Sequence, residues 1–209
     1  VSISAYNSPV LNSEGRVENT SGYEFGILNG QFRLYRRTET PKAWGGNASA
    51  AVDNFFGSYQ NGTDIRLIMY VTSQNGYTSI ICDAVYEGIT ERIFEITDDS
   101  DQRITSGTPG LYGTDVDFSM DNLLIEKIGD ISLYDTQKKA TPPTDVNGVY
   151  FFDDFNTPVL AEGSKWDQTL LNISNNRLLL NGNPGLLYLS ADKGFASEGL
   201  SCRSQGNGG

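Results

Sequence analysis

Residues 23–34 read YEFGILNGQFRL, and this stretch predicts a β-hairpin. Apolar residues alternate on both sides of Asn29-Gly30, a dipeptide that accepts the positive φ angles of a type I′ turn. A two-residue turn there pairs Ile27 with Phe32, and the next apolar pair follows two residues farther along each strand. One face of the hairpin is therefore apolar, which indicates an antiparallel sheet packed against a core.

A second hairpin is predicted within residues 65–82, IRLIMYVTSQNGYTSIIC, by the same reasoning. Its turn is Asn75-Gly76, and apolar residues alternate before the turn. The resulting register pairs Met69 with Cys82. Because Met69 lies on the apolar face, we expect Cys82 to point into the core.

A third hairpin is predicted to turn at Asn175-Asn176 and to pair Ile173 with Leu178. Other stretches combine β-branched or aromatic residues with flanking turn residues. On this pattern we expect further strands at 1–6, 91–97, 123–128, 148–152 and 185–189. Residues 48–56 favour a single helical turn, and no segment has a sustained helical period.

The composition favours an all-β chain with a single large core. Eleven Tyr and ten Phe occur together with 23 Gly, so strand-forming residues are punctuated by turn residues. A length of 209 residues is enough to bury one sizeable core. Many short strands separated by frequent turns predict an antiparallel sandwich or a barrel.

The formal net charge of −11 disfavours nucleic acid and anionic membranes as partners. No apolar stretch approaches the roughly 20 residues that a membrane-spanning helix needs. The chain begins at Val1 without a signal sequence, and it is rich in Asn, Ser, Thr and Gly. We therefore expect a processed protein that is secreted and acts in the extracellular space.

The two cysteines, Cys82 and Cys202, lie far apart in the sequence. In an oxidising compartment a disulfide between them would close a long loop and stabilise the fold by ~4 kcal/mol. The alternative is two separate buried thiols that behave as small apolar residues. The sequence leaves both open.

Five short motifs carry a resemblance to a known superfamily. Residues 107–113 read GTPGLYG, residues 121–125 read DNLLI, residues 153–156 read DDFN, Trp166 follows, and residues 173–178 read ISNNRL. The first two resemble the closing strands of concanavalin A-like lectin/glucanase sandwiches, which include laminin G-like domains. The last three resemble the opening of the same kind of domain. The resemblance implies a concanavalin A-like or jelly-roll antiparallel sandwich.

The order of these motifs is rotated, because the expected opening of the fold follows its expected end. Residues 1–134 would form the main part of the sandwich, residues 135–147 a Pro-containing linker, and residues 148–209 a C-terminal segment that completes a sheet. Three explanations stay open. The segment closes the sheet in cis as in a circular permutant, it completes an adjacent copy by strand exchange, or the chain is a window of a tandem array.

The linker favours exchange between copies. Neighbouring antiparallel strands need a loop of about 2–5 residues, whereas residues 135–147 reach ~40 Å when extended. Pro142-Pro143 also opposes a tight turn back. We therefore expect a structural subunit of an extracellular filament or fibre whose partners are other copies of itself.

The alternative is a monomeric, secreted carbohydrate-binding module of the lectin type, with glycans as its ligands. Such a module stacks exposed aromatic side chains on sugar rings. The candidates in this chain are Tyr6, Trp44, Tyr59, Tyr77 and Tyr112. No spacing among them predicts a binding face.

The residue types argue against catalysis. The chain has no histidine, which removes Ser-His-Asp and Cys-His arrangements and nearly all zinc sites. Glycosidases need two carboxylates at a set separation. Glu91, Glu95, Asp98 and Asp99 come nearest to such a set, but their spacing fits a solvated strand edge better. We expect no enzyme activity and no required cofactor.

Two kinds of site remain as candidates. The resemblance implies a structural Ca²⁺ where the first and last strands of the fold meet, with Asp121 and Asp154 as its ligands. In the alternative, these two carboxylates accept hydrogen bonds from turn amides. Glycosylation sequons of the type N-x-S/T occur at Asn19, Asn47, Asn61 and Asn172.

Overall fold

The structure is a computed structural model that describes residues 2–11, 17–57, 59, 63–113, 118–127, 149–153, 172–174, 177–180, 185–188, 195–196 and 200–208. The first strands along the chain are β1 (Ser2–Leu11), β2 (Val17–Leu28), β3 (Gln31–Arg37), β4 (Lys42–Gly45), β5 (Asp64–Gln74), β6 (Tyr77–Tyr86), β7 (Ile89–Asp98), β8 (Ser106–Gly113) and β9 (Phe118–Lys127). The later strands are β10 (Val149–Asp153), β11 (Asn172–Ser174), β12 (Arg177–Leu180), β13 (Gly185–Tyr188), β14 (Phe195–Ala196) and β15 (Leu200–Gly208). Two short helical segments, η1 (Ala48–Ala50) and α1 (Val52–Phe56), lie between β4 and β5.

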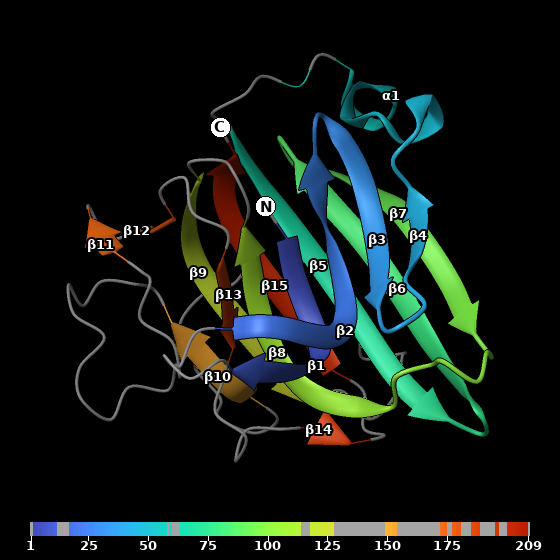
Figure 1. The fold of residues 1–209 in the computed structure, drawn as a ribbon. Helices are drawn as coiled ribbons and strands as arrows, with labels where there is room; N and C mark the ends of the chain where they lie inside the picture. The colour runs from blue at the N-terminus through green and yellow to red at the C-terminus, as the bar shows by residue number, and fades with distance from the viewer. Residues whose placement is uncertain are drawn as a thin grey trace.

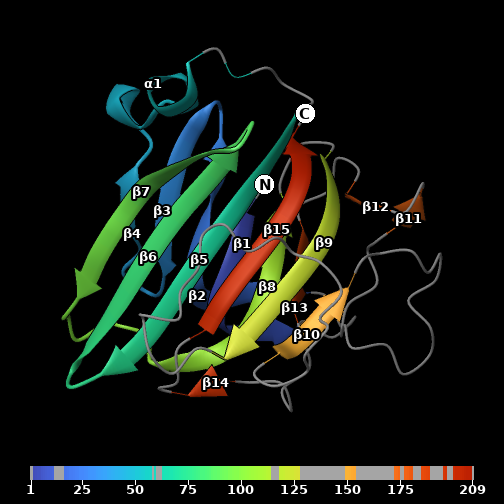
Figure 2. The ribbon, with the colours of Figure 1, turned by 180° about the vertical axis from the view of Figure 1, so that it is seen from behind.

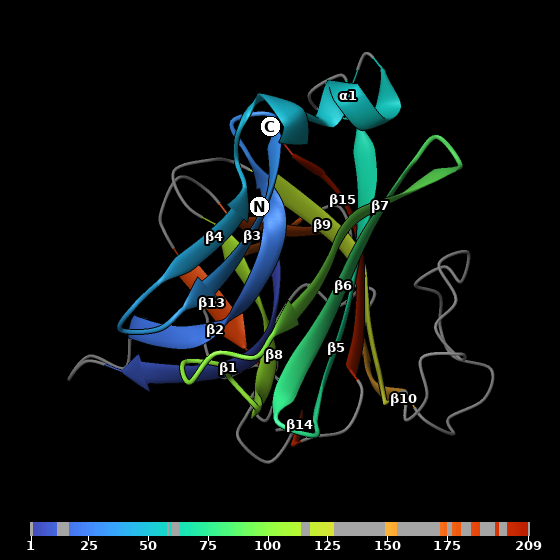
Figure 3. The ribbon, with the colours of Figure 1, turned by 90° about the vertical axis from the view of Figure 1, so that its right-hand side faces the viewer.

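The strands form two antiparallel sheets that face each other (Figures 1 and 3). We call them sheet A and sheet B. In sheet A the order is β13-β8-β1-β2-β3-β4, and β14 also pairs with β8. In sheet B the order is β11-β12-β9-β15-β5-β6-β7, and β10 also pairs with β9. The predicted all-β, sandwich-like character of the chain is confirmed.

The hairpin predicted at Asn29-Gly30 is confirmed. These two residues have φ angles of 52° and 68°, as a type I′ turn requires. The register places Ile27 opposite Phe32 and, two residues farther along, Phe25 opposite Leu34. Phe32 and its neighbours of the same phase on β3 are buried, so the apolar face of the hairpin points into the core.

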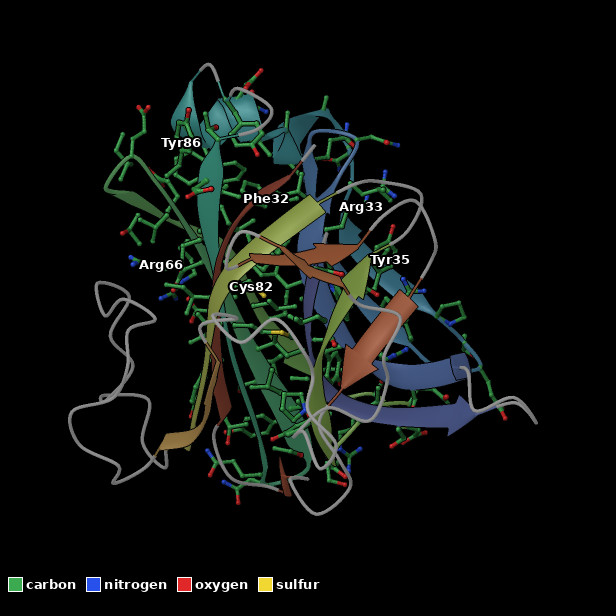
Figure 4. All side chains as sticks on the ribbon, turned by 90° about the vertical axis from the view of Figure 1, so that its left-hand side faces the viewer. Phe32, Arg33, Tyr35, Arg66, Cys82 and Tyr86 are labelled. Atoms are coloured by element: carbon green, nitrogen blue, oxygen red, sulfur yellow. The ribbon has the colours of Figure 1, made fainter. Side chains whose placement is uncertain are left out.

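The hairpin predicted at Asn75-Gly76 is also confirmed, with φ angles of 52° and 84°. Met69 lies opposite Cys82, and both side chains are fully buried. Cys82 therefore points into the core as predicted, and Figure 4 shows it between the two sheets.

Two other hairpins join neighbouring strands. Ile173 pairs with Leu178 as predicted, while the turn at Asn175-Asn176 lies outside the described residues. The sequence reasoning missed the turn at Glu87-Gly88 between β6 and β7, where the φ angles are 49° and 82°. The signal was a Gly at the second turn position between two β-rich stretches, but Glu is less distinctive than Asn at the first.

One hydrophobic cluster draws on both sheets. Its buried residues include Ile3, Tyr23, Phe25, Phe32 and Leu34 of sheet A and Ile65, Leu67, Met69, Val71, Ile80 and Cys82 of sheet B. Phe25 stacks on Phe32 at 6.0 Å between ring centroids and meets the ring edge of Phe94 from β7 at 6.1 Å. Such aromatic pairs add about 0.5–1.5 kcal/mol beyond the area that they bury.

The helical turn predicted at 48–56 is present as η1 and α1, which cover one end of the core. Phe55 and Phe56 approach the ring of Phe32 at 5.5 and 6.2 Å between centroids, and Phe56 also lies 5.8 Å from Tyr86. This short segment therefore caps the space between the sheets with aromatic side chains. Among the described residues, no helix has the length and hydrophobicity needed to cross a membrane.

Two turn glycines should differ sharply in their tolerance of alanine. A Cβ at Gly30, where φ is 68°, would meet no atom within 4 Å, so Gly30→Ala should cost about 1 kcal/mol from the backbone conformation alone. A Cβ at Gly45 would lie 2.5 Å from the Phe32 carbonyl oxygen and 2.6 Å from Phe94 Cζ. Gly45→Ala should therefore lower the free energy of unfolding by at least about twice as much, as measured by urea titration. Equal losses would contradict this close approach.

Candidate functional site

The C-terminal strand β15 is an interior strand of sheet B, held between β5 and β9 (Figure 2). On one side Leu200 pairs with Val71, and the ladder continues to Asn207 opposite Asp64. On the other side the ladder runs from Leu200 opposite Lys127 to Gly208 opposite Phe118. Both backbone edges of β15 are therefore used along nearly its whole length.

Every partner of β9 among the described residues comes from residues 149–208. One edge of β9 pairs with β15, and the other pairs with β10 and β12. Within the described part of the chain, β9 pairs with no strand of residues 2–113. In sheet A, β8 likewise has β1 on one edge and β13 and β14 on the other. We call these pairings of residues 149–208 with β5, β8 and β9 the joint.

The residue types along β15 fit the rows in which they lie. Alternate positions of β15 share cross-strand rows with buried core residues of β5: Leu200 with Val71, Cys202 with Met69, Ser204 with Leu67 and Gly206 with Ile65. The intervening positions are all polar: Ser201, Arg203, Gln205 and Asn207. In the core rows the residues become smaller along the strand, from Leu to Gly. The alternation of residue types along β15 thus matches the apolar face of β5.

The candidate disulfide is not formed, and the register explains why. Met69 of β5 pairs with Cys82 on one side and with Cys202 on the other. Because neighbouring strands are ~4.8 Å apart, the two cysteine Cα atoms lie about 10 Å from each other, whereas a disulfide needs less than about 7 Å. Cys82 is a free, buried thiol. Burial and the neighbouring Asp83 charge raise the pKa of Cys82, so the thiol stays protonated at neutral pH.

Two carboxylate-bearing positions lie near a bulge in β9, one in β9 itself and one in the neighbouring strand β10. Gln205 pairs with Asp121 and Ser204 with Leu123, so Asn122 forms a bulge between them. Asp153, at the end of β10, pairs with the same Leu123 from the other edge of β9. The row of Asp153 thus lies two positions from Asp121 along β9.

Asp154, the second ligand implied by the resemblance, lies outside the described residues. Among the side chains that the structure places, no group of three or more His, Cys, Asp or Glu residues is arranged to hold a metal ion. The calcium site at Asp121 and Asp154 stays a prediction.

A buried ion pair connects the two sheets at the end of β7. Arg36 Nη1 donates to both carboxylate oxygens of Asp98 at 2.9 Å, and their side chains are 6% and 2% exposed. The Tyr23 hydroxyl donates to Asp98 at 2.7 Å, and so does the Ser100 hydroxyl. The Ile104 amide in turn donates to the Tyr23 oxygen at 3.1 Å. Asp98 is therefore a saturated hydrogen-bond acceptor.

The pKa values follow from this network. Burial acts to raise the pKa of Asp98, but hydrogen bonds from Tyr23, Ser100 and Arg36 outweigh burial and hold it below its ordinary value. Burial and the hydrogen bond to Asp98 raise the pKa of Tyr23. A carboxylate held ionised with all of its partners in place suits a structural link between the sheets.

Sequence reasoning missed this pair, because it assigned Asp98 to a solvated edge. The available signal was the alternation along each strand, which determines the face on which a side chain lies. Arg36 shares the face of Phe32 and Leu34 on β3, and Asp98 lies in the row of the fully buried Thr78. A charged residue at an apolar-face position needs a buried counter-ion.

The other carboxylates considered for catalysis do not gather into a site. Glu91 lies in the row of Ala84, while Glu95 lies in the row of Ile81 beyond the bulge in β7, which puts the two on opposite faces. Glu95 is exposed and accepts a hydrogen bond from Arg92 at 2.8 Å.

Among the sequons, Asn47 is exposed before η1 and accepts a hydrogen bond from Ser49 at 2.6 Å. Asn19 and Asn172 lie in β2 and β11, and Asn61 is outside the described residues. Of the aromatic candidates for sugar stacking, Tyr6 is fully buried and packs in the core, Trp44, Tyr59 and Tyr77 are half-buried, and Tyr112 lies in β8.

The Arg36–Asp98 pair predicts a large effect of one isosteric change. Asp98→Asn should lower the free energy of unfolding at pH 7 by about 3–5 kcal/mol, because it leaves the buried Arg36 charge uncompensated. The exposed neighbour serves as the control, and Asp99→Asn should change stability by less than about 0.5 kcal/mol.

The effect of Asp98→Asn should also depend on pH. Since the folded pKa of Asp98 lies below its unfolded value, its contribution is complete above about pH 4 and is lost as the pH falls through the folded pKa. The difference between wild type and variant, measured by urea titration at several pH values, should therefore shrink in acid. A difference in the free energy of unfolding that stays constant down to pH 2 would show that the charge of Asp98 does not stabilise the fold.

No family model, curated protein or solved structure matches this chain.

Proposed function

We propose that this protein is the structural subunit of an extracellular filament, in which the C-terminal segment of one copy completes the sandwich of the next. The observation that carries the proposal is the place of β15 between β5 and β9. If another copy supplies this strand, the accepting copy has an open slot between β5 and β9 that the incoming strand fills.

Exchange costs little in contact energy. The pairings that β15 makes with β5 and β9 are the same whether the strand belongs to the same copy or to a neighbour, as in domain swapping. The choice then depends on the connection between β9 and β10, which includes the predicted linker 135–147, outside the described residues. A long, Pro-containing connection favours handing the segment to a neighbour over turning back.

An exchanged joint also determines the kind of assembly. The donor surface, residues 149–208, differs from the acceptor surface on β5, β8 and β9. A contact between unlike surfaces is heterologous, and it propagates as an open filament unless rotation closes a ring. A concanavalin A-like sandwich with rotated strand order, secreted to the outside of the cell, is the subunit that we propose.

A disulfide trap across the joint tests the exchange. Asp64 of β5 pairs with Asn207 of β15, so Asp64→Cys together with Asn207→Cys places two thiols on neighbouring strands. With both native cysteines replaced by alanine and the protein oxidised after assembly, exchange should yield a ladder of covalent multimers on a non-reducing denaturing gel. Negative-stain images of the same sample should show filaments.

The matched control is a pair of introduced cysteines that lies within one copy whether or not the C-terminal segment is exchanged. Ser79 of β6 pairs with Thr97 of β7, so Ser79→Cys with Thr97→Cys should give monomers with an internal bridge. If the joint variant also runs only as an internally bridged monomer, the segment closes in cis and the filament proposal is wrong. The carbohydrate-binding alternative would then be the one to test by glycan binding.

We further propose that a structural Ca²⁺ stabilises the joint at Asp121 and Asp154. Support comes from the resemblance and from the bulge at Asn122, where β10 ends beside β9. A hard cation favours clustered carboxylate and carbonyl oxygens, which the two aspartates would supply if they lie together. This proposal is separable from strand exchange, since an ion can bind a joint of either kind.

Calcium binding should appear as added thermal stability. Ca²⁺ at 100-fold excess over its Kd should stabilise EDTA-treated protein by about 2.7 kcal/mol, because it binds only the folded state. Asp121→Asn with Asp154→Asn should abolish the resulting shift in Tm, while Asp99→Asn with Asp101→Asn in the exposed turn should leave it intact. A missing shift, or one that survives the first pair of changes, would rule out this site.

A further inference from the structure

The residues that β15 places in the core rows of sheet B become steadily smaller along the strand, and we call this decrease the taper of β15. The residues are Leu200, Cys202, Ser204 and Gly206. The neighbouring strands show no such decrease. On β5 these rows hold Val71, Met69, Leu67 and Ile65, and on β9 the last three rows hold Ile125, Leu123 and Met120. This interior strand thus has its smallest residues where both neighbours have large ones.

Small residues in these rows do not favour the strand itself. Glycine loses the most conformational freedom on folding, and serine and glycine bury less apolar surface than valine or leucine. Ile65 and Leu67 are nevertheless only 3% and 2% exposed, so the core beside Gly206 and Ser204 is filled by other side chains. The reason for the taper therefore lies in the opposing sheet.

The opposing strand β1 lies close to β15. Cα atoms of β1 come within 8 Å of Cα atoms of β15 and of β5, whereas packed sheets are typically ~10 Å apart. The two chain termini lie at the same end of the sandwich, so the start of β1 faces the end of β15 (Figures 1 and 3). Ile3, near the start of β1, is fully buried in the shared core. Because a large side chain of β1 fills this end, little space remains for one from β15.

The other end of β15 has more space. There Tyr6 of β1 reaches across the core, and its hydroxyl donates to the Val71 carbonyl oxygen at 3.5 Å. Val71 lies in the row of Leu200. A bulge in β1, where Tyr6 has a φ of 56°, makes Ala5 and Tyr6 both buried although they are successive residues. A gap that takes a tyrosine from one sheet and a leucine from the other is wider than one that takes an isoleucine and a glycine.

We propose that the slot between β5 and β9 selects its strand by size, and that Ser204 and Gly206 are the residues that determine this specificity. Alternation of apolar and polar residues excludes a shift of the register by one residue, but it permits a shift by two. A shift by two would place Ser204 in the row of Ile65, or Gly206 in the row of Leu67 with a still larger mismatch along the strand. The taper therefore supplies the part of the register that alternation leaves open.

Size also discriminates among the strands of the C-terminal segment. β12 reads RLLL and β13 reads GLLY, so neither has two small residues at successive alternate positions. The slot would reject them, and in an exchanged assembly it would take the last strand of another copy of this chain. That choice of partner rests on the proposed strand exchange, whereas the size rule applies to closure in cis as well.

The sign of one substitution tests the size rule. Gly206→Val adds apolar surface and strand propensity, so without a size limit it should hold β15 more tightly. Under the size rule it should lower the protection of the β15 amides against hydrogen exchange at least about tenfold, measured by mass spectrometry of peptides that contain 200–208. The control at the wide end, Cys202→Val, should stay within about threefold of wild type. Unchanged or increased protection in Gly206→Val would overturn the inference.

A double-mutant cycle separates a size limit from a general loss of stability. Ile3→Ala removes volume from β1, so its combination with Gly206→Val should lose at least about tenfold less protection than the product of the two separate losses. Val71→Ala removes volume at the wide end, and its loss should simply multiply with that of Gly206→Val. Multiplying losses in both combinations would contradict the close approach of β1. If circular dichroism shows Gly206→Val to be unfolded, Gly206→Ala takes its place with the same expected direction.

Partner choice is measured in mixed assemblies. Two chains that carry the trap at positions 64 and 207, one of them also with Gly206→Val, are mixed in equal amounts before assembly and then oxidised. Bridges between copies should contain the unsubstituted tail at least about tenfold more often, and the substitution itself gives the linked peptides different masses. Equal use of both tails in the multimers would rule out partner selection. Internal bridges alone, with protection still lost in Gly206→Val, would show that strand exchange is wrong and that the size rule holds in cis.

Discussion

The backbone pairing of β15 with β5 on one side and β9 on the other is the constraint on which sheet B depends. Without β15, β5 would have an open edge, and β9 would have no described partner within residues 2–113. These ladders join segments that are far apart in sequence, so they form only after the entropy of a long loop closure has been lost. A contact of this kind does not specify which copy supplies the strand, because its hydrogen bonds and core rows are identical in both cases.

The parts of the fold that could be predicted from the sequence are those that local chemistry determines. An Asn-Gly turn specifies its hairpin and register within a dozen residues, and both such hairpins have the expected pairs. No local signal predicts the position of β15, since no pattern within residues 200–208 identifies β5 as the neighbouring strand. The cysteines show the same limit: Met69 intervenes between Cys82 and Cys202, and only the strand order reveals it.

The candidate sites were predicted less well for a related reason. Asp98 was assigned to a solvated strand edge because its spacing from the neighbouring carboxylates fits no catalytic set, yet alternation along β7 places it on the core face. There it is held by Arg36, which alternation along β3 also directs inward. For either residue alone, a charge on the core face is unfavourable and argues against that placement. The two placements are consistent only if Arg36 and Asp98 pair with each other, and that requires knowing that the two sheets meet there. The pair then fixes the relative position of the sheets with hydrogen bonds that an apolar core lacks.

The surface limits how copies of this protein can associate. Among the described side chains, Ile89 is the one large hydrophobic residue that is exposed, at 51%. A lone apolar residue is no docking patch, so the described surface offers no hydrophobic drive to association. What it offers is backbone, in the slot that β15 fills. Hydrogen bonds in such a slot are buried between neighbouring strands, so salt screens them little. In the proposed filament, growth by strand exchange would therefore depend on the pairing of β15 with β5 and β9 rather than on attraction between surface charges.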